Sequence, residues 1–169
     1  MLQRLQRILR HRWLDDATTR RAIPPALADK LAQHVAESER RHTGEVRIYV
    51  EAGLPLGYLW RDAVPRERAI AMFGKLGVWD TEQNNGVLIY LLLAEHAIEV
   101  VADRGLSRHV RPEQWQEVVQ HMRDAFRAGQ YEQGLLRAVD EVTALLVQHF
   151  PAAPGAHNAN ELPDTPILG

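Results

Sequence analysis

The sequence predicts a soluble, single-domain α/β fold: a small mixed β-sheet with a central antiparallel hairpin, and helices packed on both faces. Three observations lead to this prediction. The apolar run 87–93 is followed by a short connection and a second apolar run, 97–102, which together are typical of a hairpin. The segment 45–51 alternates in the manner of a half-buried strand. In most of the remaining chain, apolar residues recur at helical spacing.

The first 22 residues are predicted to form a basic amphipathic helix ahead of the domain. In a helix over 2–14, the apolar side chains fall on one stripe and arginines occupy much of the rest: the stripe is Leu2, Leu5, Leu9 and Trp13, and the arginines are Arg4, Arg7, Arg10 and Arg12. We expect the stripe to pack on the domain or on a partner. Contact with a membrane surface remains an alternative, because apolar side chains beside arginines also suit anionic headgroups.

The domain itself is predicted over residues 23–150. Its elements, in order, are a helix over roughly 26–41, strand 45–51, a loop over 53–62, a helix from Pro65 to Gly74 or Gly77, a polar loop over 78–85, strands 87–93 and 97–102, and helices over 112–129 and 131–149. The run 87–93 is apolar on both faces, which favours a central place in the sheet. Residues 151–169 are rich in Pro, Ala, Gly and Asn without any period, so we interpret them as a disordered tail.

Composition narrows the classes of function. The formal net charge is −2, so no global charge favours nucleic acid as a partner. The absence of cysteine excludes disulfides, thiolate metal ligands and a cysteine nucleophile. The N-terminus lacks the apolar core of a secretory signal, and the longest apolar run is too short for a transmembrane helix, so a cytoplasmic protein is expected.

The densest group of side-chain oxygens precedes the hairpin, in the loop that contains Asp80, Asn84 and Asn85. Asp103 ends the second hairpin strand. Because paired antiparallel strands place the end of one beside the start of the other, Asp103 is expected to lie near Asn84 and Asn85. Carboxylate and amide oxygens are hard ligands, which suit Mg²⁺ or Ca²⁺. A plainer interpretation stays open, since Asp and Asn before glycine are also ordinary loop residues.

Arg104, beside Asp103, is a weak candidate for a catalytic role. An arginine next to a metal-binding carboxylate could bind a phosphate through two hydrogen bonds. The alternative is a solvated or structural ion pair, which contributes little to stability.

Several segments resemble the TPM domain family, across residues 44–150 and in the family's order. They are Thr43-Gly44-Glu45 before the first strand, Ala71-Met72-Phe73-Gly74-Lys75-Leu76-Gly77 before the polar loop, Asn84-Asn85-Gly86-Val87-Leu88 at the start of the hairpin, and Phe126-Arg127-Ala128-Gly129-Gln130-Tyr131-Glu132-Gln133-Gly134 near the end. The resemblance implies a mixed sheet sandwiched by helices and a divalent-ion cleft beside the polar end of the hairpin. By position, the cleft residues would be Asp80, Asn84, Asn85 and Asp103.

The resemblance implies two kinds of activity, because some members are acid phosphatases and others are assembly or modulatory partners. The chain departs from the family's Gly-x-Gly-Leu-Glu after the second hairpin strand, where it has Asp103-Arg104-Gly105-Leu106-Ser107. The secretion signal and membrane helix common in the family are also not seen, which weakens a transfer of phosphatase activity.

Two hypotheses follow. The first is a non-catalytic interaction or assembly module with a divalent ion in the cleft and a protein partner, which could be membrane-associated. It is favoured slightly, because no nucleophile with a general base is recognisable. The alternative is a metal-dependent hydrolase of phosphate esters, in which Asp80 and Asp103 hold the ion and Arg104 receives a phosphoryl oxygen.

Overall fold

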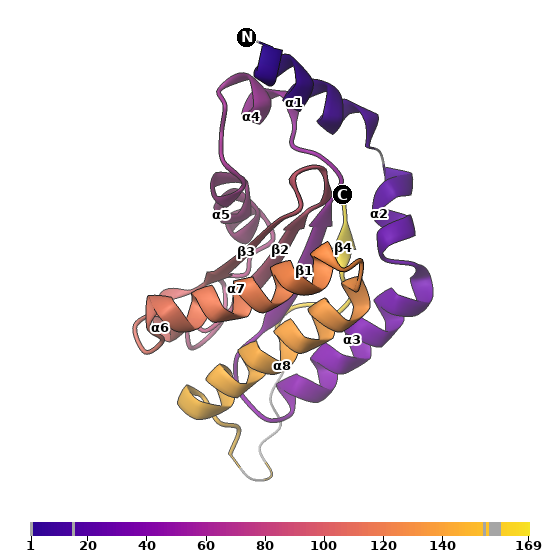
Figure 1. The fold of residues 1–169 in the computed structure, drawn as a ribbon. Coiled ribbons are helices and arrows are strands. Elements are labelled where there is room, and N and C mark those ends of the chain that lie inside the picture. The colour runs from indigo at the N-terminus through magenta and orange to yellow at the C-terminus, as the bar shows by residue number, and fades with distance from the viewer. Residues whose placement is uncertain (1, 15, 154, 156–159) are drawn as a thin grey trace.

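A four-stranded mixed sheet lies at the centre of the computed structural model, which describes residues 2–14, 16–153, 155 and 160–169 (Figure 1). Its strand order is β3-β2-β1-β4, with β1 at Val46–Glu51, β2 at Val87–Leu92, β3 at Ala97–Ala102 and β4 at Ile167–Leu168. β1 pairs in parallel with β2 and β4, whereas β2 and β3 are antiparallel. The predicted mixed sheet with its hairpin is confirmed. Within that hairpin, β2 is internal and β3 lies at an edge of the sheet.

The helices of the described residues are α1 (Leu2–Trp13), α2 (Asp16–Ala22), α3 (Pro25–Glu39), α4 (Leu56–Trp60), α5 (Pro65–Lys75), α6 (Arg104–Ser107), α7 (Pro112–Arg127) and α8 (Tyr131–His149), with a 3-10 turn at Leu93–Glu95. Of these, α2, α4 and α6 are short and were not anticipated, and α4 lies inside the predicted loop 53–62. Within the described part of the chain, no helix combines the length and apolar character needed to cross a membrane.

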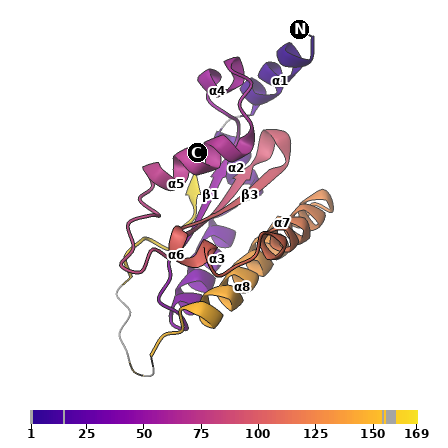
Figure 2. The same cartoon turned by 90° about the vertical axis from the view of Figure 1, so that its left-hand side faces the viewer.

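Helices cover both faces of the sheet, as predicted (Figure 2). Alternate residues of the strands, such as Ile48 and Ile89, pack against α3, α7 and α8 in one apolar core. The residues between them, such as Leu88 and Tyr90, face a second core that includes Met72 of α5. The two cores follow from the twofold alternation of side chains along a strand.

Strand β1 differs from the prediction of a half-buried strand, because all six of its residues are buried. The alternation of Val46, Ile48 and Val50 with polar neighbours suggested a solvent face. Arg47 and Glu51 are instead buried at 5% and 4% exposure. A strand with neighbours on both sides and helices on both faces has no solvent face, so its polar side chains need partners inside the protein.

The C-terminal segment also differs from the sequence interpretation of 151–169 as a disordered tail. Residues 160–169 return to the sheet, where β4 pairs with Tyr49 and Val50 of β1. Leu162 and Ile167 pack on the second core. Composition did not reveal this, because two strand residues and a few apolar contacts leave no periodic pattern. Residues 154 and 156–159 of the predicted tail lie outside the described residues.

The N-terminal helix is present, but its orientation is the reverse of the one expected for packing on the domain. Leu5, Leu9 and Trp13 of the apolar stripe are exposed, at 55%, 56% and 84%. The opposite side of α1, which carries Arg7 and His11, contacts the domain instead.

We predict that deletion of Ile167–Gly169 opens one edge of β1 without unfolding the rest of the sheet. The amide of Ala52 donates to the carbonyl of Gly169 at 2.9 Å, so its hydrogen exchange should accelerate by at least about tenfold in the shortened protein. The amide of Val87, which donates to Glu45 on the other side of β1, serves as the internal control. Unchanged protection of Ala52 would show that β4 does not seal this edge.

Candidate functional site

The structure brings together the two stretches that were predicted to meet at the polar end of the hairpin. The amide of Asp103 donates to the carbonyl of Gly86 at 2.9 Å, which continues the pairing of β2 with β3. The amide of Gly105 donates to the carbonyl of Asn84 at 2.8 Å. The loop before β2 therefore lies directly against the start of α6.

Asn85 holds this loop from inside the protein. It is fully buried, its main-chain amide donates to Thr81 Oγ1, and its side-chain Nδ2 donates to Thr43 Oγ1, both at 3.1 Å. The other side-chain atom, Oδ1, is buried without a hydrogen-bond partner among the described residues. The asparagine is thus oriented by two bonds that leave one acceptor unused.

Asp103 has the same kind of unused acceptor. Its Oδ1 accepts from the amide of Arg104 at 2.6 Å and caps α6. Its Oδ2 is buried and has no partner within the described part of the chain. Buried polar atoms are nearly always paired, with protein, water or an ion. The two oxygens without a described partner belong to segments that hydrogen-bond to each other.

The other two predicted ligands and Arg104 lie at the surface. Asp80, Asn84 and Arg104 are exposed. Asn84 has a φ of 53°, a left-handed conformation that asparagine tolerates better than most residues. Its main-chain carbonyl, and not its side chain, makes the contact with Gly105. Metal binding by these side chains and a catalytic role for Arg104 remain predictions.

The donor set at this end suits one class of cation better than another. Within the described residues, no group of three or more His, Asp or Glu side chains is arranged to hold a metal ion, and the chain has no cysteine. The buried donors are one carboxylate and one amide oxygen, with main-chain carbonyls nearby. Such a mixed oxygen set suits a hard cation such as Ca²⁺, which accepts six to eight oxygens in flexible geometry, rather than Zn²⁺.

Gly105 allows the loop and α6 to approach closely. A Cβ atom at this position would lie 2.3 Å from the carbonyl oxygen of Asn84 and 2.5 Å from that of Gln83. These are main-chain atoms, so they cannot move aside as a flexible side chain could. The absence of a side chain at 105 is therefore required for the two carbonyls to lie here.

We predict that Gly105→Ala destabilises the protein by about 1–3 kcal/mol, because the added methyl group pushes the loop away from α6. The measurement is the free energy of unfolding in urea. Gly74→Ala is the matched control, since a Cβ there would meet nothing within 4 Å and the site is inside α5. The control should be neutral or stabilising by up to about 1 kcal/mol. Equal effects of the two substitutions would contradict the close approach at Gly105.

Sequence comparison adds to this geometry. The model of the TPM domain family matches residues 18–145, which is well over half of the chain. The chain belongs to the TPM domain family. The resemblance inferred from the motifs is thereby confirmed.

Structure comparison gives the same fold. This TPM domain is similar to a solved structure described as the NMR structure of BA42 protein from the psychrophilic bacteria Bizionia argentinensis, with a TM-score of 0.76 and 22% identity. The match covers 87% of this chain and 95% of that one. At this identity the likeness concerns the fold alone. No curated protein matches the chain significantly.

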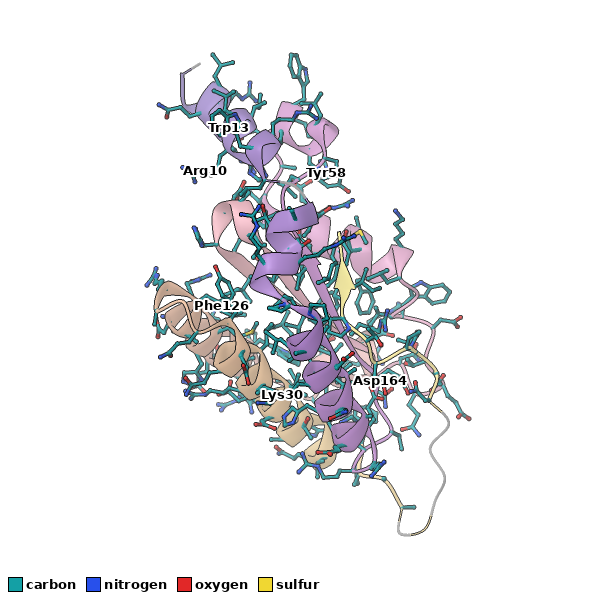
Figure 3. The ribbon with its side chains drawn as sticks, turned by 90° about the vertical axis from the view of Figure 1, so that its right-hand side faces the viewer. Arg10, Trp13, Lys30, Tyr58, Phe126 and Asp164 are labelled. Atoms are coloured by element: carbon teal, nitrogen blue, oxygen red, sulfur yellow. The ribbon has the colours of Figure 1, made fainter. Side chains whose placement is uncertain are left out.

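The TPM domain also contains a buried acidic cluster that sequence reasoning missed. Both carboxylate oxygens of Glu45 accept main-chain amides from the C-terminal segment, those of Glu161 and Leu162, at 3.2 and 3.1 Å. Glu39 accepts the amide of Val46 at 2.8 Å. Burial raises the pKa of Glu39 to about 9 and that of Glu45 to about 7, and Asp164 of the C-terminal segment adds to both shifts (Figure 3). The cluster fastens the C-terminal segment beside β1.

We predict that stability declines as pH rises, because of these two carboxyl groups. A carboxyl group with a raised pKa keeps its proton in the folded protein at a pH where the unfolded chain has lost it. Each carboxyl group therefore contributes fully to the stability of the folded protein below about pH 4.5, the ordinary pKa of a glutamate. This contribution is lost as pH rises through about 7 for Glu45 and about 9 for Glu39. Urea unfolding at several pH values measures the decline.

Glu45→Gln is the control, since it removes the titration while keeping one side-chain acceptor for the C-terminal segment. The difference in unfolding free energy between native protein and variant should change between about pH 4.5 and 7 and then level off. A difference that is constant across this range would contradict a raised pKa of Glu45.

A second buried network lies on the other face of β1, beneath α5. Arg68 donates two hydrogen bonds to Glu51, from Nε at 3.0 Å and Nη2 at 2.6 Å, and the hydroxyl of Tyr90 donates to the same carboxylate at 2.7 Å. Burial raises the pKa of Tyr90, which keeps this hydroxyl protonated and able to donate. Every charge is paired, so this network explains the burial of Glu51 and offers no open site.

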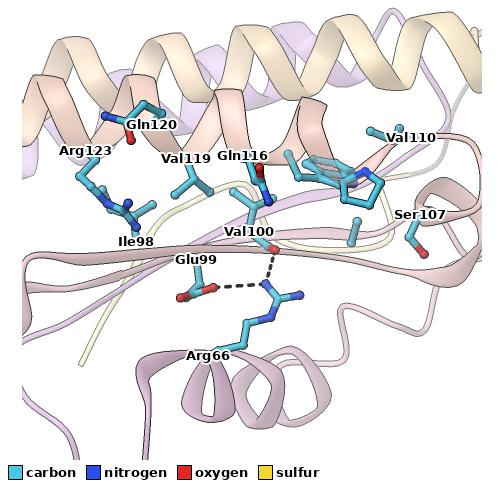
Figure 4. A pocket seen from close by; sticks show the side chains of 13 residues that line it. Arg66, Ile98, Glu99, Val100, Ser107, Val110, Gln116, Val119, Gln120 and Arg123 are labelled. Carbon is cyan, nitrogen blue, oxygen red and sulfur yellow. Dashed lines mark hydrogen bonds and ion pairs between the residues drawn. The ribbon is translucent and has the colours of Figure 1, made fainter.

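A groove of about 680 Å³ runs between α7 and the edge strand β3 (Figure 4). Its apolar wall includes Ile98 and Val119, and Arg66 and Arg123 lie along it. Arg66 donates to the carbonyl of Val100 and to Glu99, so this arginine is already engaged. The groove contains none of the predicted metal ligands.

Proposed function

We propose that this TPM domain is a non-catalytic interaction module that binds Ca²⁺ at the polar end of its hairpin. The observation that carries the proposal is the pair of buried, unpaired oxygens, Asn85 Oδ1 and Asp103 Oδ2, on segments that hydrogen-bond to each other. A bound cation would satisfy both oxygens and relieve the cost of leaving them buried without a partner.

Asp103 and Asn85 are the residues that would hold the ion directly. Asp103 supplies the negative charge, and Asn85 supplies a neutral oxygen that Thr43 and Thr81 already hold in place. The main-chain carbonyls of Gln83 and Asn84, which lie against Gly105, are further oxygens of the kind that Ca²⁺ accepts. Asp80 and Asn84, which are exposed on the same loop, remain candidates to complete the shell from outside.

The low charge of this set implies a weak site. Ca²⁺ affinity falls as carboxylates are replaced by neutral oxygens, so a dissociation constant near the millimolar range is expected. An ion held by few protein ligands keeps positions open to an outside oxygen. We propose that an acidic group of a protein partner occupies such a position, which would make partner binding depend on Ca²⁺.

The surroundings of the nearest hydroxyl groups do not favour a hydroxyl nucleophile. Thr43 Oγ1 donates to the amide oxygen of Gln83, and Thr81 Oγ1 accepts from the amide of Asn85. A hydroxyl nucleophile needs a general base that accepts its proton, usually a histidine or a carboxylate. Among the described residues, neither hydroxyl is hydrogen-bonded to such a group.

We predict that millimolar Ca²⁺ raises the melting temperature of the native protein and that Asp103→Asn abolishes most of this increase. The substitution keeps a side-chain oxygen to cap α6, yet it removes the charge that attracts the ion. Affinity should fall at least about tenfold. Thermal unfolding at several Ca²⁺ concentrations gives the affinity through the ligand's stabilising effect.

Glu82→Gln is the matched control, because it removes one negative charge from the same exposed loop without touching the buried oxygens. It should bind Ca²⁺ within about twofold of the native protein. No melting shift at about 10 mM Ca²⁺, or equal shifts in native protein and Asp103→Asn, would overturn the cation site.

The alternative function, a metal-dependent phosphatase, has one observation in its favour: the exposed guanidinium of Arg104 directly follows Asp103. The phosphatase is distinguished from the interaction module by adding p-nitrophenyl phosphate, a phosphate ester, to the native protein and its variants. Turnover that requires the divalent ion and is lost in both Asp103→Asn and Arg104→Gln would replace the non-catalytic proposal. Ca²⁺ binding without turnover supports it.

A further inference from the structure

Helix α1 is attached to the domain by its polar side. Arg7 donates to Glu95 at 2.7 Å, to Asp62 at 2.8 Å and to the carbonyl of Ala63 at 2.7 Å. His11, which is 4% exposed, accepts the amide of Leu54 at Nδ1 and contacts Glu95 through Nε2 at 2.8 Å. These bonds to four separate residues fix which side of the helix faces the domain.

The apolar side of α1 therefore faces solvent. An amphipathic helix on a globular protein ordinarily buries its apolar stripe and exposes its polar side. Here Leu5, Leu9 and Trp13 are more than half exposed, while Ile8, on another side of the helix, packs on the domain. The arrangement leaves the stripe available to something outside the chain.

Helix α4 adds apolar side chains to the same end of the molecule. α1 and α4 lie next to each other there, beyond the end of the sheet (Figures 1 and 2). Leu56 and Trp60 of α4 and the neighbouring Val64 are exposed at 54%, 75% and 55%. Of the eight large hydrophobic side chains that are exposed among the described residues, six belong to this end. Such a concentration is typical of an interaction surface.

The charges around the apolar stripe favour an anionic partner. Arg4, Arg10 and Arg12 are exposed, and none of them forms an ion pair within the described residues. In a helix of about 3.6 residues per turn, Arg10 and Arg12 fall on opposite borders of the stripe. Among the acidic side chains that the structure describes near this end, Asp62 pairs with Arg7 and Glu67 pairs with Arg61.

We propose that the α1–α4 end of the TPM domain binds the surface of an anionic lipid bilayer. Leu5, Leu9, Trp13 and Trp60 enter the boundary between headgroups and acyl chains, where tryptophan is favoured because its ring is apolar and its N–H is polar. Arg10 and Arg12 lie level with the lipid phosphates on either side of the helix. The proposal goes beyond the cation site, because it uses no residue of the polar end of the hairpin.

The test measures flotation of the full chain with vesicles, in buffer that contains a chelator of divalent ions. One set of vesicles is phosphatidylcholine alone, and the other contains about one-third phosphatidylserine. The native protein should float with the anionic vesicles at least about tenfold more strongly than with the neutral ones, and added salt should weaken the binding.

Two double variants separate the apolar and the charged contributions. Leu5→Gln with Leu9→Gln, and Arg10→Gln with Arg12→Gln, should each lower binding to anionic vesicles at least about tenfold. All four side chains are exposed, so the melting temperature should not change. Ile70→Gln with Trp79→Gln is the matched control, since it removes two equally exposed apolar side chains elsewhere and should leave binding unchanged.

Asp103→Asn should float like the native protein, so failure of the Ca²⁺ site and failure of lipid binding can be told apart. Absence of binding to anionic vesicles would overturn the proposal, as would binding that persists in the Leu5–Leu9 variant. A native dimer in solution that the same variant converts to a monomer would also overturn it, because a second copy would then cover the stripe.

Discussion

The burial of β1 on every side is the constraint on which the rest of the structure depends. β1 has β2 and β4 as neighbours and helices over both faces, yet it carries Arg47 and Glu51, and Glu45 directly precedes it. A charge in such a place is costly unless it is paired or neutralised. Arg68 and Tyr90 satisfy Glu51 from α5 and β2, and the C-terminal segment satisfies Glu45. Hydrogen bonds to Glu51 of β1 and to Glu45 before it therefore help to position α5, β2 and the C-terminal segment.

The sequence predicted those parts of the fold that depend on local pattern. The hairpin was predictable because a strand that is apolar on both faces is followed, after a very short connection, by another apolar strand. The contact between segments 84–86 and 103–105 followed from antiparallel geometry. Helices α3, α5, α7 and α8 have apolar residues at regular spacing, and their predicted positions agree with the structure to within a few residues.

The parts that escaped prediction depend on contacts between distant segments. Alternation in β1 suggested a solvent face, because nothing local shows that Arg47 is buried or that Glu51 meets partners from elsewhere in the chain. Residues 160–169 are held beside the sheet by the amides of Glu161 and Leu162. These amides donate to Glu45, which lies more than a hundred residues earlier in the sequence. For α1, the stripe was visible, but the three bonds of Arg7 that decide its orientation join residues 55 or more positions apart.

The candidate site, likewise, was predictable only in part. Its location was accessible from topology, whereas the distinction between buried Asn85 and Asp103 and exposed Asp80 and Asn84 depends on the folded loop. What singles out the first pair is the oxygen that each leaves unused, and that can be recognised only when every other hydrogen bond is known. Residue type alone gave four equivalent candidates.

The contact of Arg66 with Val100 has a consequence for how the molecule behaves at high concentration. Val100 lies three residues before Asp103, whose amide points toward β2, so the alternation of an antiparallel pair turns the carbonyl of Val100 outward from the open edge of β3. An unpaired strand edge can form hydrogen bonds with a strand of another molecule, which promotes aggregation. Arg66 donates a hydrogen bond to that carbonyl at 2.6 Å. Its charged side chain therefore blocks part of the edge of β3, which no strand of the described chain covers.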